Sequence, residues 1–230
     1  MKKKLSLIFM SICTAAAFVI TSVKNENSSA DYTPVWNSNN HPLIIIDAGH
    51  GGLDNGATAY DGKPEKTYNL SLAKALESFF SAAGYDTVMT REDDGDTDGK
   101  SGFDKKLDIA NRLALANADD NRIFISIHLN LSYSPTDKGF QVFYGSKNPE
   151  SKILAETIRN KMKQSDLCTR VRDVYEAPSD IFLQHNIKVP CVLVECGFIS
   201  NVEDYSRIKS EEYRTKLMYT LFCGITEYLQ

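Results

Sequence analysis

Four side chains that could bind a metal or move a proton stand beside apolar runs in this 230-residue sequence. His50 follows the run LIIIDAG, His128 ends RIFISIH, and Glu195 ends VPCVLVE. Glu65 opens the amphipathic stretch EKTYNLSLA. Imidazole nitrogens and carboxylate oxygens are both common zinc ligands. Two histidines and one or two carboxylates would therefore make a zinc site if the fold brought them together.

The glycine-rich run DAGHGGLDNGA, residues 47–57, raises an alternative, a phosphate cradle. Glycine-rich turns after strands bind phosphates through backbone N–H groups. This run lacks the GxGxxG and GK[ST] patterns, and no helix is expected directly after its glycines. A single histidine at a strand end is more often structural than a ligand, so the metal hypothesis depends on the whole set.

The apolar pattern alternates between short runs typical of strands and longer stretches with helical spacing. Strands are expected at 43–47, 87–90, 122–128, 139–145 and 189–195, and helices at 65–83, 107–118, 151–163 and 211–229. This alternation predicts an α/β fold, a three-layer sandwich with a mostly parallel twisted sheet and helices on both faces. The carboxyl ends of parallel strands share one edge of a sheet, so the four side chains are expected to converge there.

The N-terminal 30 residues have the pattern of an export signal. Three lysines at 2–4 precede an apolar stretch from Leu5 to about Val23, and small residues at 28–30 suit cleavage. The apolar stretch is close to the ~20 residues that a membrane-spanning helix needs. A cleaved signal peptide and a retained anchor in contact with the membrane both remain open. Either one places the rest of the chain outside the cytoplasmic membrane.

The remainder is expected to be a polar linker, residues 31–42, followed by a single catalytic domain, residues 43–230. The net charge is −4 and there is no basic stripe, so nucleic acid is excluded as a partner. The four cysteines of the domain have no CxxC spacing, which argues against a zinc site built from thiolates. Cys191 and Cys196 are an odd number of residues apart in one strand, so they should be buried free thiols on opposite faces. A disulfide between other pairs remains open.

Six segments resemble, in order, the motifs of the zinc-dependent N-acetylmuramoyl-L-alanine amidases. They are DAGHGGLDNGA, EKTYNLSLA, TR at 90–91, DIAN at 108–111, ISIHLN and VLVECGFISN, and they span nearly all of residues 43–229. The resemblance implies one zinc ion per chain, held by His50, Glu65 and His128, with Glu195 as the catalytic carboxylate. It also implies that the partner is peptidoglycan, cut at the amide between the lactyl group of N-acetylmuramic acid and L-alanine.

The chemistry of these residues agrees with the implied roles. Two histidines and one glutamate leave a zinc position open for water, as a catalytic site requires. Glu195 would then take a proton from the water and pass it to the leaving amine. The alternative makes Glu195 a fourth ligand, which would close the site. Asp47, Arg91, Asn111 and Asn130 belong to the same motifs and are expected to bind substrate or to support the ligands.

A lysine near the DIAN segment departs from the family pattern. The family usually has an arginine five residues before the asparagine of its IAN motif, and Lys106 stands there in this chain. Lysine cannot reproduce the fork of an arginine in a paired contact. The proposed zinc ligands are untouched by this change.

The layout of the chain carries expectations about its role. A short chain with an N-terminal export segment and no wall-binding repeats resembles the germination-specific amidases of spore formers, although single-domain vegetative amidases share the layout. Only about ten residues separate SIHLN from GFQVFYG, too few for the inhibitory helix of some relatives. We therefore expect a separate protein activator that stabilises zinc binding. The rival functions are a non-catalytic peptidoglycan-binding or regulatory protein and a zinc peptidase that cuts within the stem peptide.

Overall fold

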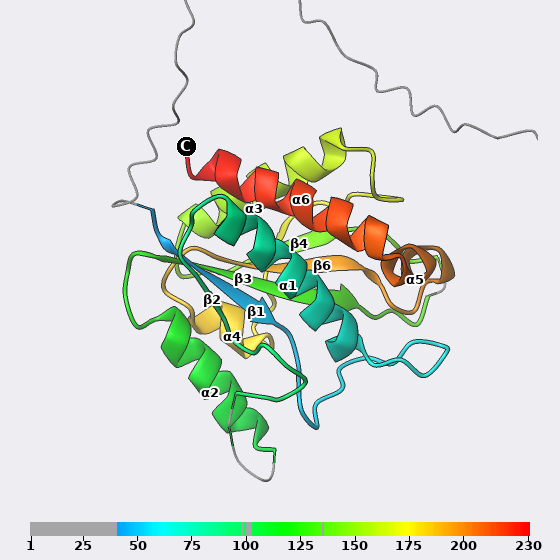
Figure 1. Cartoon of the computed structure of the whole chain (residues 1–230), viewed down its shortest axis with the longest axis horizontal. Coiled ribbons are helices and arrows are strands. Elements are labelled where there is room, and N and C mark those ends of the chain that lie inside the picture. Colours follow the sequence, from blue (N-terminus) through cyan, green and yellow to red (C-terminus); the bar gives the residue numbers. More distant parts are fainter. Residues whose placement is uncertain (1–40, 98, 100–102, 135) are drawn as a thin grey trace, which may run out of the picture. The chain divides into compact units, whose positions relative to one another are not determined.

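A six-stranded sheet lies at the centre of the computed structural model, which describes residues 41–97, 99, 103–134 and 136–230 (Figure 1). The predicted export segment lies outside the described residues, as does all of the predicted linker except positions 41 and 42. The strands are β1 (Leu43–Ala48), β2 (Thr87–Met89), β3 (Arg122–Asn130), β4 (Gln141–Tyr144), β5 (Tyr175–Glu176) and β6 (Cys191–Phe198).

The strand order is β2-β1-β3-β6-β4-β5. Every neighbouring pair is parallel except β4 and β6, which are antiparallel. The prediction of a mostly parallel sheet is therefore confirmed.

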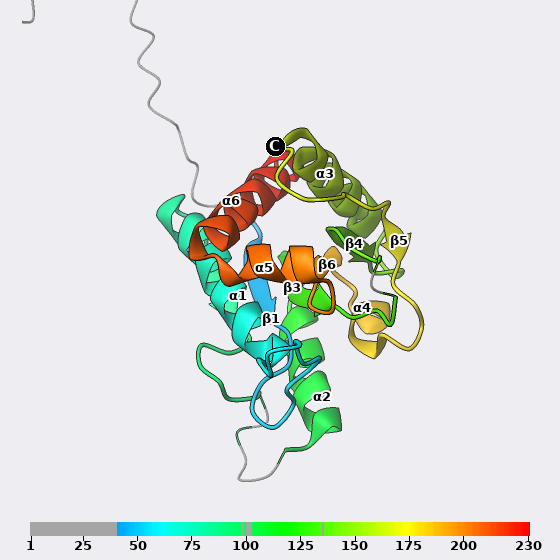
Figure 2. The ribbon, with the colours of Figure 1, turned by 90° about the vertical axis from the view of Figure 1, so that its right-hand side faces the viewer.

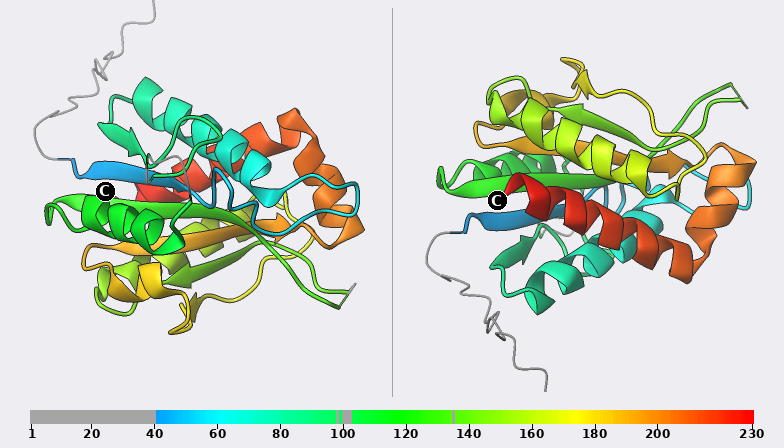
Figure 3. Two further views of the ribbon diagram at one scale, coloured as in Figure 1. Left: turned by 90° about the horizontal axis from the view of Figure 1, so that it is seen from below. Right: turned by 90° about the horizontal axis from the view of Figure 1, so that it is seen from above.

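Helices cover both faces of this sheet. They are α1 (Glu65–Ala82), α2 (Lys105–Ala116), α3 (Glu150–Gln164), α4 (Phe182–Asn186), α5 (Val202–Lys209) and α6 (Glu211–Tyr228). Figures 2 and 3 show α1, α3 and α6 over one face, and α2 and α4 over the other. The predicted three-layer sandwich is confirmed. Within the described part of the chain, no helix has the length and apolarity needed to span a membrane.

Alternation along the strands explains the two layers of helices. Ile44, Ile46 and Ala48 of β1 lie in the larger core, which includes residues of α1, α3 and α6. Ile45 lies in the smaller core, which residues of α2 and α4 complete. Successive side chains of a strand point to opposite faces, so a strand buried on both sides is apolar throughout. Asp47 follows Ile45 on the smaller-core face, where it is 1% exposed.

Three elements were not predicted, β5, α4 and α5, and their lengths are two, five and eight residues. Segments this short do not complete the repeats on which a periodicity argument depends. The helix α2 begins at Lys105, two residues earlier than predicted, because the side chain of Asp104 accepts hydrogen bonds from the backbone N–H groups of Lys106 and Leu107.

The described cysteines are all free thiols. Cys191 belongs to the smaller core and Cys196 to the larger one, which confirms that they point to opposite faces. Burial raises the pKa of both thiols. Both are therefore uncharged packing residues at neutral pH.

Candidate functional site

Four separate elements deliver the predicted site residues to one edge of the sheet. His50 comes two residues after β1, and Glu65 is the first residue of α1. His128 lies in β3 and Glu195 in β6, and these two residues are direct neighbours in the register of the parallel pair. Because β1, β3 and β6 run in the same direction, the chain emerges from all of them at this edge.

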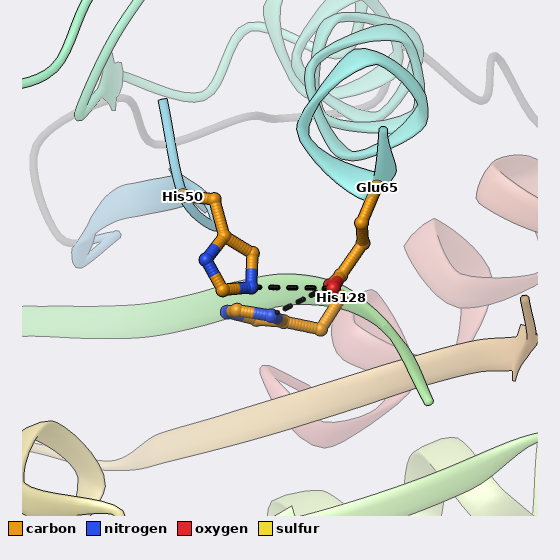
Figure 4. Close-up of side chains that lie close together, drawn as sticks. All are labelled: His50, Glu65 and His128. Atoms are coloured by element: carbon orange, nitrogen blue, oxygen red, sulfur yellow. Dashed lines mark hydrogen bonds and ion pairs between the residues drawn. The ribbon is translucent and has the colours of Figure 1, made fainter. Parts of the chain in front are cut away.

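Three of these side chains meet. The carboxylate of Glu65 lies between the two imidazoles, with Oε1 3.0 Å from His128 Nδ1 and Oε2 3.3 Å from His50 Nε2 (Figure 4). One potential ligand atom from each residue lies within 4.8 Å of the others. Two nitrogens and one oxygen in this arrangement are the donor set of a three-residue zinc site.

The protein holds the carboxylate of Glu65 in its charged form. Backbone N–H groups of Ala57 and Leu129 and the side-chain amide of Asn69 donate to its oxygens at 2.9–3.0 Å. Burial alone would raise the pKa of Glu65, but the contacts with His128 and His50 outweigh it, so the pKa lies well below its usual value. Glu65 is therefore charged at neutral pH and can act as an anionic metal ligand.

The imidazole of His50 has a second acidic neighbour, because Asp54 Oδ2 lies 2.9 Å from its Nδ1. Burial would lower the pKa of His50, but Glu65 and Asp54 together raise it to about 9. A carboxylate on the far nitrogen is the usual second partner of a metal-binding histidine, since it fixes the ring orientation and the tautomer. The contact leaves Nε2 facing Glu65 and the centre of the cluster.

Two glycines make room for the rings. A Cβ at Gly49 would overlap the His128 imidazole, and a Cβ at Gly56 would lie 2.6 Å from Glu65 Oε2. Gly56 also has a φ of +63°, which side chains with a Cβ rarely adopt. The imidazole cluster therefore requires glycine at these two positions of the glycine-rich run, because a larger residue would occupy its space.

Glu195 lies beside this cluster and outside it, since the described residues bring together three ligand side chains and not four. Its Oε2 is buried and has no hydrogen-bond partner among the described residues. Burial, aided by the nearby Glu65, raises the pKa of Glu195 well above its usual value, although His50 opposes the shift. A carboxylate of this kind is a stronger base than an exposed one, so it can take up a proton near neutral pH.

A cavity of about 370 Å³ connects Glu195 with the two histidines. The lining of the cavity includes Lys105 and Ile109 of α2 and residues 180–184 at the start of α4. Lys105 lines the cavity, with its Nζ 3.7 Å from Asp54 Oδ2. Lys106 itself is exposed.

The residues expected to bind substrate or to support the ligands form hydrogen bonds with neighbouring backbone groups and side chains. Arg91 donates to backbone carbonyl groups, and Asn111 donates to the carbonyl of Thr97 at 2.7 Å. Asp47 accepts hydrogen bonds from Ser126 and Thr90. Asn130 ends β3, and its carbonyl accepts from the N–H of Ile199 at 2.9 Å.

Sequence reasoning missed Asp54 and Arg112, although both stand next to motifs that it used. Asp54 lies inside the glycine-rich run, and Arg112 directly follows the DIAN segment. Arg112 is 3% exposed and forms ion pairs with Asp47 and Asp108. A buried carboxylate at 47 with no cation nearby in sequence was the available signal, because a buried charge needs a partner.

Comparison with known proteins agrees with this geometry. A family model described as N-acetylmuramoyl-L-alanine amidase matches residues 44–227. The chain belongs to the N-acetylmuramoyl-L-alanine amidase family. The resemblance noted in the six sequence motifs is thereby confirmed.

Relatives of this amidase include enzymes of Bacillus subtilis. The germination-specific N-acetylmuramoyl-L-alanine amidase is 28% identical over 99% of this chain and 96% of its own length. The amidase LytC is 33% identical over 99% of this chain, which corresponds to 46% of the longer protein.

A solved structure of the CwlD amidase from Clostridioides difficile, in complex with the GerS lipoprotein, superposes with a TM-score of 0.76. It is 32% identical and covers 82% of this chain and 98% of that one. The α/β fold of the family is therefore shared.

Proposed function

We propose that this amidase uses zinc to hydrolyse the amide between the lactyl group of N-acetylmuramic acid and L-alanine in peptidoglycan. The observation that supports the proposal is the cluster of His50, Glu65 and His128. Beside it, Glu195 lines the same cavity as the two histidines, and its Oε2 has no hydrogen-bond partner among the described residues. A donor set of three side chains suits a hydrolytic zinc ion, because such a site keeps one position open.

In the proposed mechanism the three cluster residues hold the metal, and Glu195 moves the protons. A bound zinc ion would supply a Lewis acid that polarises the scissile carbonyl group and lowers the pKa of the attacking water. Glu195 accepts a proton from that water at Oε2 and then donates it to the nitrogen of the leaving L-alanine. Asp54 keeps His50 oriented throughout.

The test is to digest purified peptidoglycan with the isolated protein and to identify the new ends by mass spectrometry. We expect stem peptides with free L-alanine amino termini. New termini within the stem would identify a zinc peptidase, and binding without any new terminus would identify a non-catalytic wall protein.

Acid should weaken zinc binding, because a metal displaces the proton from His50. The pKa of His50 is raised to about 9, so the ring is protonated at neutral pH in the absence of metal. Below this pKa the apparent zinc affinity should increase about tenfold for each unit by which the pH is raised, because one proton is displaced. Titration calorimetry in buffers of different ionisation enthalpy would count the protons released. An affinity that stays constant between pH 6 and pH 8 would contradict this prediction.

We also infer that the enzyme works outside the cytoplasmic membrane, in the spore cortex. The predicted N-terminal export segment and the similarity to the germination-specific amidase support this location. Deletion of the gene should leave the cortex without muramic lactam, the product that such amidases help to make. An unaltered cortex would favour a vegetative role.

A partner protein is the last part of the proposal. The complex of the related CwlD amidase with the GerS lipoprotein supports it. The segment 54–64 leads directly into Glu65 and carries Ala57, which donates to the Glu65 carboxylate. It contacts α5 through a 2.7 Å hydrogen bond from Tyr205 to Asp61. A partner that immobilised this segment or residues 129–138, which follow His128, would raise zinc affinity.

By linkage, zinc should also tighten binding of the partner. We therefore expect the purified domain alone to carry less than one zinc per chain and to act slowly on cortex-type peptidoglycan. Measurement of its zinc content and of its hydrolysis rate tests this. Full occupancy with rapid hydrolysis and no added protein would rule out the activator.

A further inference from the structure

Three consecutive carbonyl groups, at the last residue of β1 and the two residues that follow it, accept hydrogen bonds from two buried arginines. The carbonyl of Ala48 accepts from Arg91 Nε at 2.9 Å and from Arg112 Nη1 at 3.1 Å. The carbonyl of Gly49 accepts from Arg91 Nη2 at 3.1 Å. The carbonyl of His50 accepts from Arg112 Nη2 at 2.8 Å. The backbone from Ala48 to His50, which carries one proposed zinc ligand, is therefore fixed by arginine hydrogen bonds at each of its three residues.

This backbone needs holding, because His50 has a φ of +62°. Residues with a Cβ avoid the left-handed region, and they stay there only where the surroundings impose it. The turn that follows brings Asp54 back beside the His50 ring through backbone hydrogen bonds with Gly51 at 2.9 and 3.0 Å. If the backbone relaxed to a negative φ, the imidazole would leave both Asp54 and Glu65.

Arg112 is itself fixed and has no free charge to offer a substrate. Its guanidinium pairs with Asp47 of β1 and with Asp108 of α2. Asp47 in turn accepts hydrogen bonds from Thr90 and Ser126. Although Arg112 lines the cavity, its charge is balanced by these two carboxylates.

Arg91 connects the same backbone to the helix that carries Glu65. Its Nη2 also donates to the carbonyl of Lys66, the residue after Glu65, at 2.9 Å. The side-chain amide of Asn69 adds a second connection, since it donates to Gly49 and to Glu65 Oε1. The spacing between His50 and Glu65 is therefore set by side chains that touch neither imidazole.

We propose that Arg91 and Arg112 are positioning residues that hold the His50 backbone in its left-handed conformation and thereby set the affinity for zinc. The inference rests on the proposed function, in which His50 binds the metal. A lysine in place of Arg112 would keep a positive charge between Asp47 and Asp108. It could not donate to these carboxylates and to two carbonyl groups at once, because only the guanidinium has donors spread in a fixed plane.

The experiment measures zinc affinity of metal-free R112K by competition with a chromophoric chelator, at a temperature where circular dichroism shows a folded protein. We expect the zinc Kd to rise about 10- to 100-fold, the usual effect of losing a residue that orients a ligand. R91K, which breaks the contacts to Gly49 and Lys66, should have an effect in the same direction and replaces R112K if that variant does not fold.

Two control variants separate positioning from general stability. R122K removes a guanidinium that lies away from the site and donates a hydrogen bond to the carbonyl of Leu115. L154A removes a fully buried side chain of α3 on the other face of the sheet. Both should bind zinc as the wild type does, even where L154A lowers the unfolding temperature as much as R112K.

The outcomes separate this inference from the proposed function. Wild-type affinity in folded R112K and R91K, or an equal loss in L154A, would overturn the positioning role. If the unaltered protein itself bound no zinc, the proposed function would fail instead.

Discussion

Replacement of Glu195 by glutamine should lower the turnover of peptidoglycan by about 10²- to 10⁴-fold, the typical contribution of a general acid–base group. The amide has nearly the same shape as the carboxyl group but cannot accept the proton of the attacking water. Zinc content should be unchanged, because Glu195 lies outside the cluster of three ligand side chains in the described part of the chain. Rates of amide cleavage and zinc content of the same preparation give both answers.

A suitable control is Glu176→Gln, which changes an exposed glutamate of β5. Its activity should equal that of the wild type. If Glu195→Gln lost zinc, Glu195 would be a fourth ligand and the site would be closed. If it kept nearly full activity, the base would be a different residue.

Replacement of His128 by alanine should remove both zinc and activity. The two remaining donors, His50 and Glu65, cannot hold the metal as a set of three does. Glu65 would also lose the 3.0 Å contact that helps to keep its pKa low. Atomic spectroscopy of the purified variant gives the zinc content, and circular dichroism shows whether the protein is folded.

His185→Ala is the matched control, because His185 is a histidine of α4 whose Nδ1 contacts Ser146 at 3.3 Å, and it does not line the cavity. This variant should keep its zinc and its activity. Stoichiometric zinc in His128→Ala would show that the proposed set of ligands is wrong.

The path of the chain was predictable wherever burial gives a regular pattern. The continuous apolar runs of β1, β3 and β6 indicated central parallel strands, because both faces of such strands are covered. Because parallel strands end at one edge, the convergence of His50, His128 and Glu195 was predictable as well. Glu65 was predictable through its place at the start of an amphipathic stretch.

The short elements α4 and α5 were not predictable, and α4 forms one side of the cavity. Their residues are positioned by contacts with distant parts of the chain and not by a local repeat. Leu183 of α4 and Ile187 directly after it, for example, pack with Phe124 of β3 in the smaller core. Such contacts depend on where the sheet lies, which local periodicity does not encode.

The sequence by itself determined the fold class and the convergence of the imidazole and carboxylate side chains, because alternating strands and helices predict a parallel sheet whose strands end at one edge. Only the tertiary structure decided that Asp54 pairs with His50 and that Asp47 reaches the site through Arg112, 65 residues away in the chain. From the sequence, Asp47 and not Asp54 was expected to support the ligands. The left-handed turn at His50 separates them, because it brings Asp54 back against the imidazole and leaves Asp47 in the sheet.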